Sequence, residues 1–420
     1  MRTRSIGACA IAAAAVLLFA GRNVATARAQ DAAHLTAPSE PVPASLFGMH
    51  IHNAGGTTAW PSVPFAEWRL WDARVAWPQI EPRKSQWDFR ALDAYLALAK
   101  EHNIDVLLPL ALSPPWVSAR PTEKSAYQPG MAAEPADNDA WRDYVTRVAT
   151  HCKGRVHSYE IWNEPNYKPF WTGDVDTMVN LTRQAYQIIH RIDPDARVVS
   201  PSATTATGVD WLSTFLSHGG NQYVDVIGYH FYAAPQPPEA MVPLIQKVRQ
   251  VIDEHGAAQK PLWNTESGWP QPKPFPSADL AAAYLARAYI LNWAAGVQRL
   301  YWYAWDNHTW ASLQLTAADS QTLTPAGRAY GAVQQWLVGA QMRSCDEDPG
   351  HTWICALARN DVPEWIVWNT DGEVPFSVPA GWRATSATPL LGASHPLAGT
   401  TLEINQVPQL LTRLPDESRN

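Results

Sequence analysis

The sequence predicts an α/β fold in which eight parallel strands and their crossover helices form a TIM barrel, followed by a small C-terminal β-sandwich-like domain. From Ser45 to Ala340, short apolar or β-branched runs alternate with segments whose apolar residues recur at helical spacing, which implies parallel strands joined by helices. Eight such units fit a TIM barrel better than an open doubly wound sheet, which usually has fewer strands. No glycine-rich phosphate loop follows the first run, which also argues against a dinucleotide-binding fold.

The individual elements follow from these patterns. In the segment 175–192, for example, Met178, Leu181, Ala185 and Ile188 fall on one face of a helix. The predicted strands are 45–53, 66–72, 104–112, 156–164, 196–204, 224–232, 260–267 and 298–307. The predicted helices are 89–103, 139–151, 175–192, 208–218, 239–256, 278–296 and 325–339. Together they place the barrel at 45–340.

After Ala340 the helical pattern stops, and strand-like segments separated by Gly, Pro and Asp turns follow. They are 352–359, 364–370, 374–380 and 401–407. We therefore expect a β-domain at 341–412 and a tail at 413–420. Cys345 and Cys355 lie close together in this region, and a local disulfide between them is plausible in an exported protein.

The N-terminus has the features of a secretory signal peptide. A basic start, MRTR, precedes an apolar run that is too short to span a membrane, and small residues at Ala27 and Ala29 suit cleavage after Ala29. Residues 1–29 are therefore predicted to be a signal peptide, and the Pro/Ala-rich segment 30–44 a linker. The mature protein is expected to be secreted or periplasmic, without stable membrane association.

Composition narrows the classes of partner. A net charge of -7 with 17% charged residues provides no basic stripe or Lys/Arg cluster of the kind that binds nucleic acid. The 21 tryptophans are unusual, and rigid aromatic faces serve either core packing or stacking against flat apolar surfaces such as those of sugar rings.

Two glutamates stand out at the ends of predicted strands. Glu164 occurs in Trp-Asn-Glu-Pro and Glu266 in Trp-Asn-Thr-Glu, so each has a similar aromatic and amide setting. Active sites of TIM barrels lie at the C-terminal ends of the strands. Two facing carboxyl groups there suit cleavage of a glycosidic bond, because one must protonate the departing oxygen while the other meets the cationic anomeric carbon.

The motifs WNEPN, GYHFY and TE-x-GW resemble those of clan A retaining glycoside hydrolases, most closely family 39 and related bacterial exopolysaccharide glycosidases. The resemblance implies a cofactor-free enzyme that cleaves β-glycosidic bonds of an oligo- or polysaccharide by double displacement. It assigns Glu164 as the general acid/base and Glu266 as the nucleophile that forms the glycosyl-enzyme.

The resemblance also implies roles for neighbouring residues. Asn163 is expected to bind the sugar 2-hydroxyl, Arg69 and Tyr232 to lower the pKa of Glu266, and the negative Glu266 to raise that of Glu164. Trp305 is expected to form the floor of the cleavage subsite. Further candidate substrate-binding residues are His50, His52, Trp116, His230 and Trp269.

Two alternative functions remain open. His50, His52 and Asp306 together suggest a metal-dependent amidohydrolase-type barrel, but strand 196–204 has no histidine and strand 156–164 offers glutamate where a bridging lysine is expected. The other alternative is a catalytically silent carbohydrate-binding barrel. No residue selects the sugar, the linkage, or exo against endo action.

Overall fold

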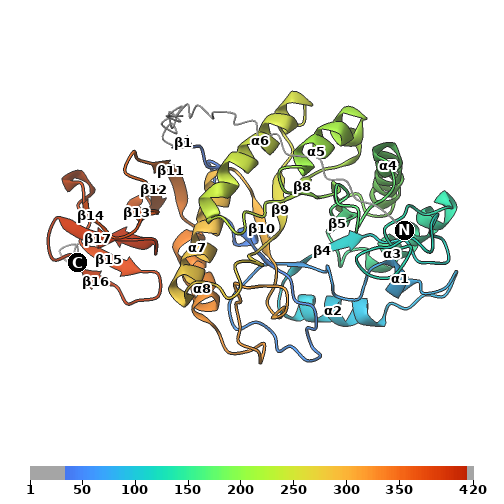
Figure 1. The fold of residues 1–420 in the computed structure, drawn as a ribbon, viewed down its shortest axis with the longest axis horizontal. Helices are drawn as coiled ribbons and strands as arrows, with labels where there is room; N and C mark the ends of the chain where they lie inside the picture. Colours follow the sequence, from blue (N-terminus) through green and yellow to red (C-terminus); the bar gives the residue numbers. More distant parts are fainter. Residues whose placement is uncertain (1–33, 414–420) are drawn as a thin grey trace, which may run out of the picture.

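Residues 34–413 are described by a computed structural model. They form a barrel and, after it in the chain, a separate β-domain that lies beside the barrel (Figure 1). The predicted signal peptide at 1–29 and residues 414–420 of the predicted tail lie outside the described residues.

The barrel sheet contains nine parallel strands in the order β6-β5-β4-β3-β2-β10-β9-β8-β7. Their bounds are β2 Phe47–Met49, β3 Glu67–Arg69, β4 Asp105–Leu110, β5 Ser158–Ile161, β6 Arg197–Val199, β7 Ala203–Thr204, β8 Ile227–His230, β9 Leu262–Ser267 and β10 Arg299–Trp302. The strands β6 and β7 are two parts of the predicted strand 196–204. A parallel bridge between Val199 and Val226 joins this fifth strand to the sixth and closes the ring. The eight predicted strands are therefore all present.

The barrel interior is filled by side chains that alternate along these short strands. Leu107, Val199, Val226, Trp263 and Tyr301 form one buried apolar cluster inside the ring. The apolar runs recognised in the sequence are continuous rather than strictly alternating because both faces of a parallel strand are covered.

Seven long helices surround the ring, and all seven were predicted. They are α2 Arg90–Glu101, α3 Asn138–Cys152, α4 Val175–Ile192, α5 Gly208–Ser217, α6 Met241–Glu254, α7 Ala278–Ala294 and α8 Pro325–Leu337. Several begin at side-chain caps: Asp174, for example, accepts a hydrogen bond from the backbone N–H of Thr177. A short helix, α1 Trp77–Ile80, was not predicted, and the connection from β2 to β3 contains no helix among the described residues.

The C-terminal domain is a two-layered antiparallel unit. A seven-stranded sheet in the order β1-β11-β12-β13-β18-β15-β16 packs against the two-stranded sheet β14-β17. The bounds are β1 His34–Leu35, β11 Gln341–Glu347, β12 Thr352–Arg359, β13 Val362–Asn369, β14 Val374–Ser377, β15 Ser386–Pro389, β16 His395–Pro396, β17 Thr401–Ile404 and β18 Gln409–Thr412. Cys345 and Cys355 face each other on β11 and β12 and are joined by a disulfide.

Helix α7 connects the two parts of the molecule. It is apolar around most of its circumference, as a helix covered on all sides must be. In Figure 1 it lies with α8 between the barrel strands and the C-terminal sheets. The predicted barrel with a C-terminal β-domain is thus confirmed.

The segment 30–44 is not a free linker over its described part. Leu35 of β1 pairs with Cys345 of β11, so this segment supplies the edge strand of the C-terminal sheet. Val42 is buried and exchanges backbone hydrogen bonds with Gly339 and Ala340. The sequence pattern did not predict these contacts, because a two-residue strand is too short to show alternation.

Among residues 34–413, no helix combines the length and apolar character that crossing a bilayer would require.

Candidate active site

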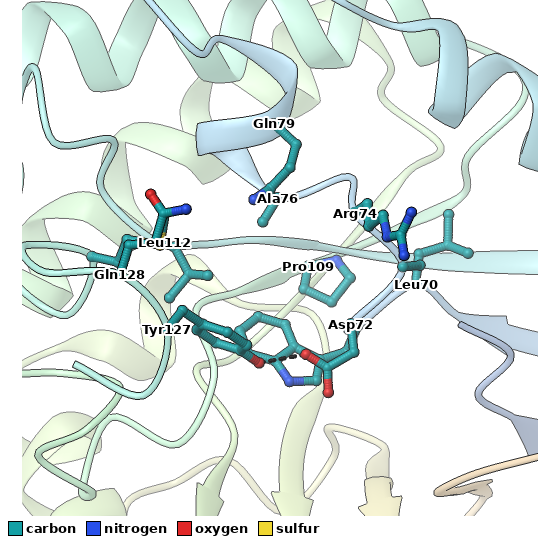
Figure 2. Close-up of a pocket in the computed structure, with 12 residues that line it drawn as sticks. Leu70, Asp72, Arg74, Ala76, Gln79, Pro109, Leu112, Tyr127 and Gln128 are labelled. Carbon is teal, nitrogen blue, oxygen red and sulfur yellow. Dashed lines mark hydrogen bonds between the residues drawn. The ribbon is translucent and has the colours of Figure 1, made fainter. Parts of the chain in front are cut away.

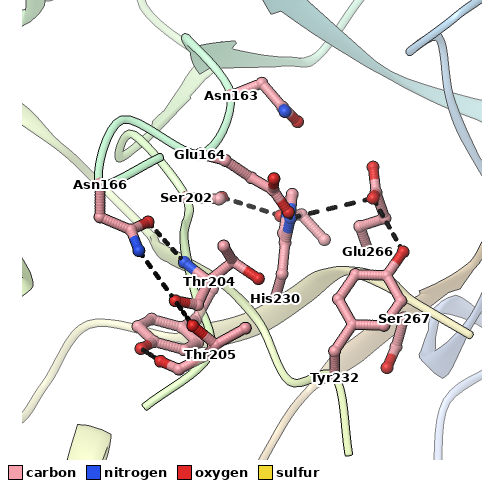
Figure 3. Close-up of polar contacts among 12 residues, drawn as sticks. Asn163, Glu164, Asn166, Ser202, Thr204, Thr205, His230, Tyr232, Glu266 and Ser267 are labelled. Atoms are coloured by element: carbon pink, nitrogen blue, oxygen red, sulfur yellow. Dashed lines mark hydrogen bonds and ion pairs between the residues drawn. The ribbon is translucent and has the colours of Figure 1, made fainter. Parts of the chain in front are cut away.

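A cavity of about 610 Å³ opens at the carboxyl ends of the barrel strands, and both predicted catalytic glutamates line it. Glu164 follows β5 and Glu266 lies near the end of β9, and Figure 3 shows the two carboxyl groups converging on His230. One oxygen of Glu164, one oxygen of Glu266 and a ring nitrogen of His230 all lie within 4.8 Å of one another. A single sugar ring can therefore contact both carboxyl groups.

Glu266 is held from two sides. Its Oε2 accepts a hydrogen bond from Nη1 of Arg69 at 2.7 Å, and its Oε1 accepts one from the Tyr232 hydroxyl at 2.8 Å. Arg69 ends β3 and Tyr232 follows β8, so three strands fix one carboxylate. Both donors were predicted to lie beside Glu266, and both do.

Arg69 is fully buried and connects more groups than the sequence indicated. Its Nε donates to Glu160 at 2.6 Å, and its Nη2 donates to Oδ1 of Asn163 at 2.8 Å. Glu160 also accepts a hydrogen bond from the hydroxyl of Ser202. One permanent cation thus pairs with two buried carboxyl groups, and Glu160 is a component of the site that sequence reasoning missed. The sequence feature that could have identified Glu160 is a charged residue in the middle of an otherwise apolar strand.

Arg69 and Tyr232 act on the pKa of Glu266 in the predicted direction, but the pKa is raised overall. Burial raises the pKa of this carboxyl and the nearby Glu164 adds to the rise, while Arg69 and the Tyr232 hydroxyl act in the opposite direction. The prediction named the donors but left out desolvation, the largest contribution. The donors limit the rise, and their geometry suits the ionised carboxylate, since Arg69 contributes a full charge at hydrogen-bonding distance.

Glu164 is aimed into the cavity by an unusual backbone. Trp162 and Glu164 have positive φ values of 64° and 44°, a region that costs non-glycine residues free energy and is common at functional sites. Two contacts with the fifth strand hold this turn. The Glu164 N–H donates to the Ser202 carbonyl, and the Asn166 side chain both donates to and accepts from the Thr204 backbone (Figure 3). The second asparagine of WNEPN therefore anchors the turn.

Burial raises the pKa of Glu164 to about 7, with Thr204 and Arg69 opposing the rise and Glu160 adding to it. The predicted rise of the Glu164 pKa is found, but its main cause is burial rather than the charge of Glu266. Oε1 of Glu164 lies 2.9 Å from Nδ1 of His230. Burial lowers the pKa of His230 to about 4, so this histidine is a neutral partner near neutral pH.

Asn163 lines the cavity beside Glu164. Because its Oδ1 accepts from Arg69, the orientation of the amide is set, and the amide nitrogen is the group left to donate to a ligand. This geometry is compatible with the predicted contact to a sugar hydroxyl.

Three predicted tryptophans lie outside the cavity lining. Trp305 and Trp269 are buried, and their indole N–H groups donate to the carbonyls of Ser320 and Gln236. Trp116 donates to the Glu81 carbonyl and lines a different depression. None of the three therefore lies among the residues that line the cavity containing Glu164 and Glu266.

His50 and His52 are also absent from the cavity lining. His50 is fully buried behind Arg69, bonded to the Trp302 carbonyl and to Nη1 of Arg69, so it positions Arg69 rather than touching a ligand. His52 lies near Asp306, with Nδ1 3.8 Å from the carboxylate.

Aromatic residues that were not predicted line the cavity instead. Tyr303 follows β10, and Trp310 packs edge-on against it with ring centroids 5.0 Å apart. Trp71, Tyr167 and Phe170 also contribute to the lining. The sequence placed an aromatic at the end of the eighth strand but selected Trp305, two positions beyond Tyr303.

The metal-dependent alternative is not supported by the contacts of its proposed ligands. Asp306 accepts from the N–H groups of His52 and Asn53 and from the hydroxyl of Thr58, which is the role of a loop anchor. Within the described residues, the group with metal-type spacing is Glu164, His230 and Glu266. The guanidinium of Arg69 bonded to Glu266 opposes a second cation there.

The fold and site together define a class: a TIM barrel whose fourth and seventh strands present paired glutamates, as in glycoside hydrolases. A family model, glycosyl hydrolases family 39, matches residues 75–303, which is more than half of the chain. The chain belongs to this family, and the resemblance inferred from its motifs is confirmed.

Individual relatives agree with this assignment. A β-xylosidase of Geobacillus stearothermophilus is 26% identical over 226 residues, covering 47% of this chain and 44% of the relative. A β-xylosidase of Caldicellulosiruptor saccharolyticus is 25% identical over 216 residues, covering 44% of each. The chain thus matches less than half the length of these curated relatives.

Solved structures share the fold. A family 39 glycoside hydrolase from Bacteroides cellulosilyticus superposes with a TM-score of 0.72 at 19% identity, covering 89% of this chain and 81% of that one. A family 39 β-xylosidase from Caulobacter crescentus superposes with a TM-score of 0.66 at 16% identity, covering 90% of this chain and 99% of that one. At these identities the likeness concerns the fold.

Proposed function

We propose that this protein is a retaining β-glycosidase that works by double displacement, with Glu266 as the nucleophile and Glu164 as the general acid/base. The observation that carries the proposal is the approach of the two carboxyl groups to within 4.8 Å in one cavity. Retaining enzymes place these groups about 5 to 5.5 Å apart, whereas inverting enzymes need roughly 6.5 to 9.5 Å to admit a water. The close approach favours retention.

In the first step, Glu266 attacks the anomeric carbon while protonated Glu164 transfers its proton to the departing glycosidic oxygen. The raised pKa of Glu164, about 7, keeps a useful fraction protonated near neutral pH. Arg69 and Tyr232 orient the attacking carboxylate. Asn163 is suited to bind the 2-hydroxyl, a contact that strengthens as positive charge develops on the ring.

In the second step, water attacks the glycosyl-enzyme and Glu164, now ionised, removes its proton. Forming the ester removes the charge of Glu266, which favours ionisation of Glu164. Its bond to neutral His230 restrains the carboxyl group without supplying a fixed charge. The same group can therefore serve first as acid and then as base.

The proposed substrate is a β-linked oligo- or polysaccharide. The aromatic lining of Trp71, Tyr303 and Trp310 suits the apolar faces of sugar rings. The curated relatives are named β-xylosidases, so β-xylosides are the first substrates to test. The signal-like N-terminus supports export to the periplasm or the medium as part of the same proposal.

The test is a panel of aryl β-glycosides and β-linked polysaccharides assayed with wild-type protein, Glu266→Gln and Glu164→Gln. Hydrolysis by wild type and its loss in Glu266→Gln are expected. Binding of sugar by wild type without any turnover would favour the silent carbohydrate-binding alternative. A matched control is Gln250→Ala, an exposed change on α6 far from the cavity, which should retain wild-type turnover.

A further inference from the structure

A second cavity of about 340 Å³ lies beside the catalytic one, and the proposed function does not use it (Figure 2). The two cavities share Trp71, Asp72 and Tyr127 in their linings. A ligand that extends beyond the catalytic cavity in this direction would reach the second one directly.

A polar bridge separates the cavities. The Tyr127 hydroxyl donates to Oδ1 of Asp72, and the Tyr303 hydroxyl donates to Oδ2 at 2.6 Å. Both carboxylate oxygens of Asp72 are therefore engaged by neutral hydroxyl donors. Tyr127 is 43% exposed, so the bridge stands at the surface rather than within the core.

The second cavity has an apolar base and a polar edge. Leu70, Pro109, Leu112 and Met131 supply the base. Arg74, Gln79 and Gln128 supply the edge, with Arg74 at one end and Gln128 at the other in Figure 2. An apolar surface with a few convergent polar groups is the usual character of a small-molecule site, and a sugar ring matches it with one apolar face and a polar rim.

The polar groups at this edge are available. In residues 34–413, no hydrogen bond or ion pair engages the side chains of Arg74, Gln79 or Gln128. By contrast, Arg90, which lies near Arg74 at an adjoining depression, is paired with Asp88. Arg74 is thus a full positive charge at the rim of a cavity, without an internal partner.

We propose that the second cavity binds a sugar unit next to the one being cleaved, and that this unit carries a carboxylate recognised by Arg74. The inference rests on the proposed glycosidase function and deepens it, because it assigns the substrate to the acidic glycans. Gln79 and Gln128 bond hydroxyls of the same unit, and the base of the cavity receives its apolar face. Guanidinium suits this role because its planar donors match a carboxylate.

The test measures binding to the Glu266→Gln variant, in which turnover is removed. The probes are β-linked di- and trisaccharides in matched pairs, one member carrying a uronic acid where the other carries a hydroxymethyl group. For at least one pair, we expect the acidic member to bind at least about tenfold more tightly at low salt, as a charge-assisted hydrogen bond provides. Added salt should reduce the preference, because the contact lies at the surface.

Two further variants assign the preference to Arg74. Adding Arg74→Ala should bring the two dissociation constants of the pair together, whereas Arg90→Ala, with the same loss of charge on an exposed side chain, should keep them apart. Arg74 has a positive φ of 60°, and alanine is no worse than arginine there, so folding should be unaffected. Melting temperatures check this.

Equal binding of both members across all pairs, including no binding of either, would overturn the proposal, as would a preference that survives Arg74→Ala. Failure of the proposed function is a separate result, because it appears as absence of hydrolysis by wild-type protein whatever the variants bind.

Discussion

Arg69 donates from Nη1 to Oε2 of Glu266 at 2.7 Å inside the ring of strands, and both side chains are buried. The same guanidinium bonds Glu160 and Asn163. The arrangement links Glu266 to the fourth strand, and Glu164 follows the end of that strand. Several consequences of this network can be measured.

Replacing Arg69 by methionine should abolish the alignment of Glu266 and leave two buried carboxylates without their cation. We expect kcat/KM to fall by at least about a hundredfold and the free energy of unfolding to fall by about 3 to 5 kcal/mol. Steady-state kinetics and denaturant unfolding measure the two effects.

The matched control is Arg287→Met. Arg287 is equally buried and pairs with Glu239 at 3.3 Å, remote from the cavity. The Arg287→Met variant should lose stability but retain kcat/KM under conditions where it is folded. If Arg69→Met does not fold, Arg69→Lys, which keeps the charge, takes its place. Wild-type kcat/KM in a folded Arg69 variant would contradict its role.

Changing Tyr232 to phenylalanine removes the donor to Oε1 of Glu266 without altering shape. Since a hydrogen bond to a charged group contributes about 1.5 to 3 kcal/mol, kcat/KM should fall roughly tenfold to a hundredfold. Tyr144→Phe is the control, because that buried hydroxyl has no hydrogen-bond partner among the described residues. Equal activity of the two variants would show that the Tyr232 hydroxyl is not needed.

The pH dependence of kcat/KM should report Glu164. Its pKa of about 7 means that the fraction able to donate a proton falls as pH rises through this value, so kcat/KM should decline above about pH 7. The decline should disappear in Glu164→Gln, whose residual activity should fall most for substrates with poor leaving groups. If the residual kcat/KM of this variant still declined above about pH 7 as in wild type, the decline would belong to another group.

The same pKa predicts an effect on stability. Folding raises the pKa of Glu164 from 4.5 to about 7, so the folded state binds the proton more tightly, and stability falls as pH rises between these values. Glu164→Gln removes this loss. The variant should match wild type near pH 4 and exceed it by up to about 3 kcal/mol above pH 7. Urea unfolding at both pH values measures the difference, and a variant less stable than wild type at the higher pH would contradict the account.

The barrel strands and helices could be predicted from sequence because continuous apolar runs mark the buried parallel strands, whereas apolar residues at helical spacing mark the helices. Glu164 and Glu266 were identifiable as well, since a carboxylate ending an apolar run needs a partner or a use. The contact of Arg69 and Tyr232 with Glu266 followed from the family resemblance rather than from any spacing.

The aromatic lining could not be predicted in the same way. Trp305 and Trp310 differ by five positions in a segment without regular structure, and only the path of the chain decides that one is buried and the other faces the cavity. The contacts of His50 and Glu160 with Arg69 could not be predicted, because they depend on which side of a short strand faces Arg69. The net direction of the Glu266 pKa required the extent of burial, which no motif encodes.

The most direct measurement of the central claim is the anomeric configuration of the first sugar released from a β-glycoside, followed by proton NMR before mutarotation. Attack by Glu266 followed by attack by water inverts the anomeric carbon twice, so the product should appear first as the β-anomer. Initial release of the α-anomer would mean a single displacement by water and would contradict a glycosyl-enzyme on Glu266.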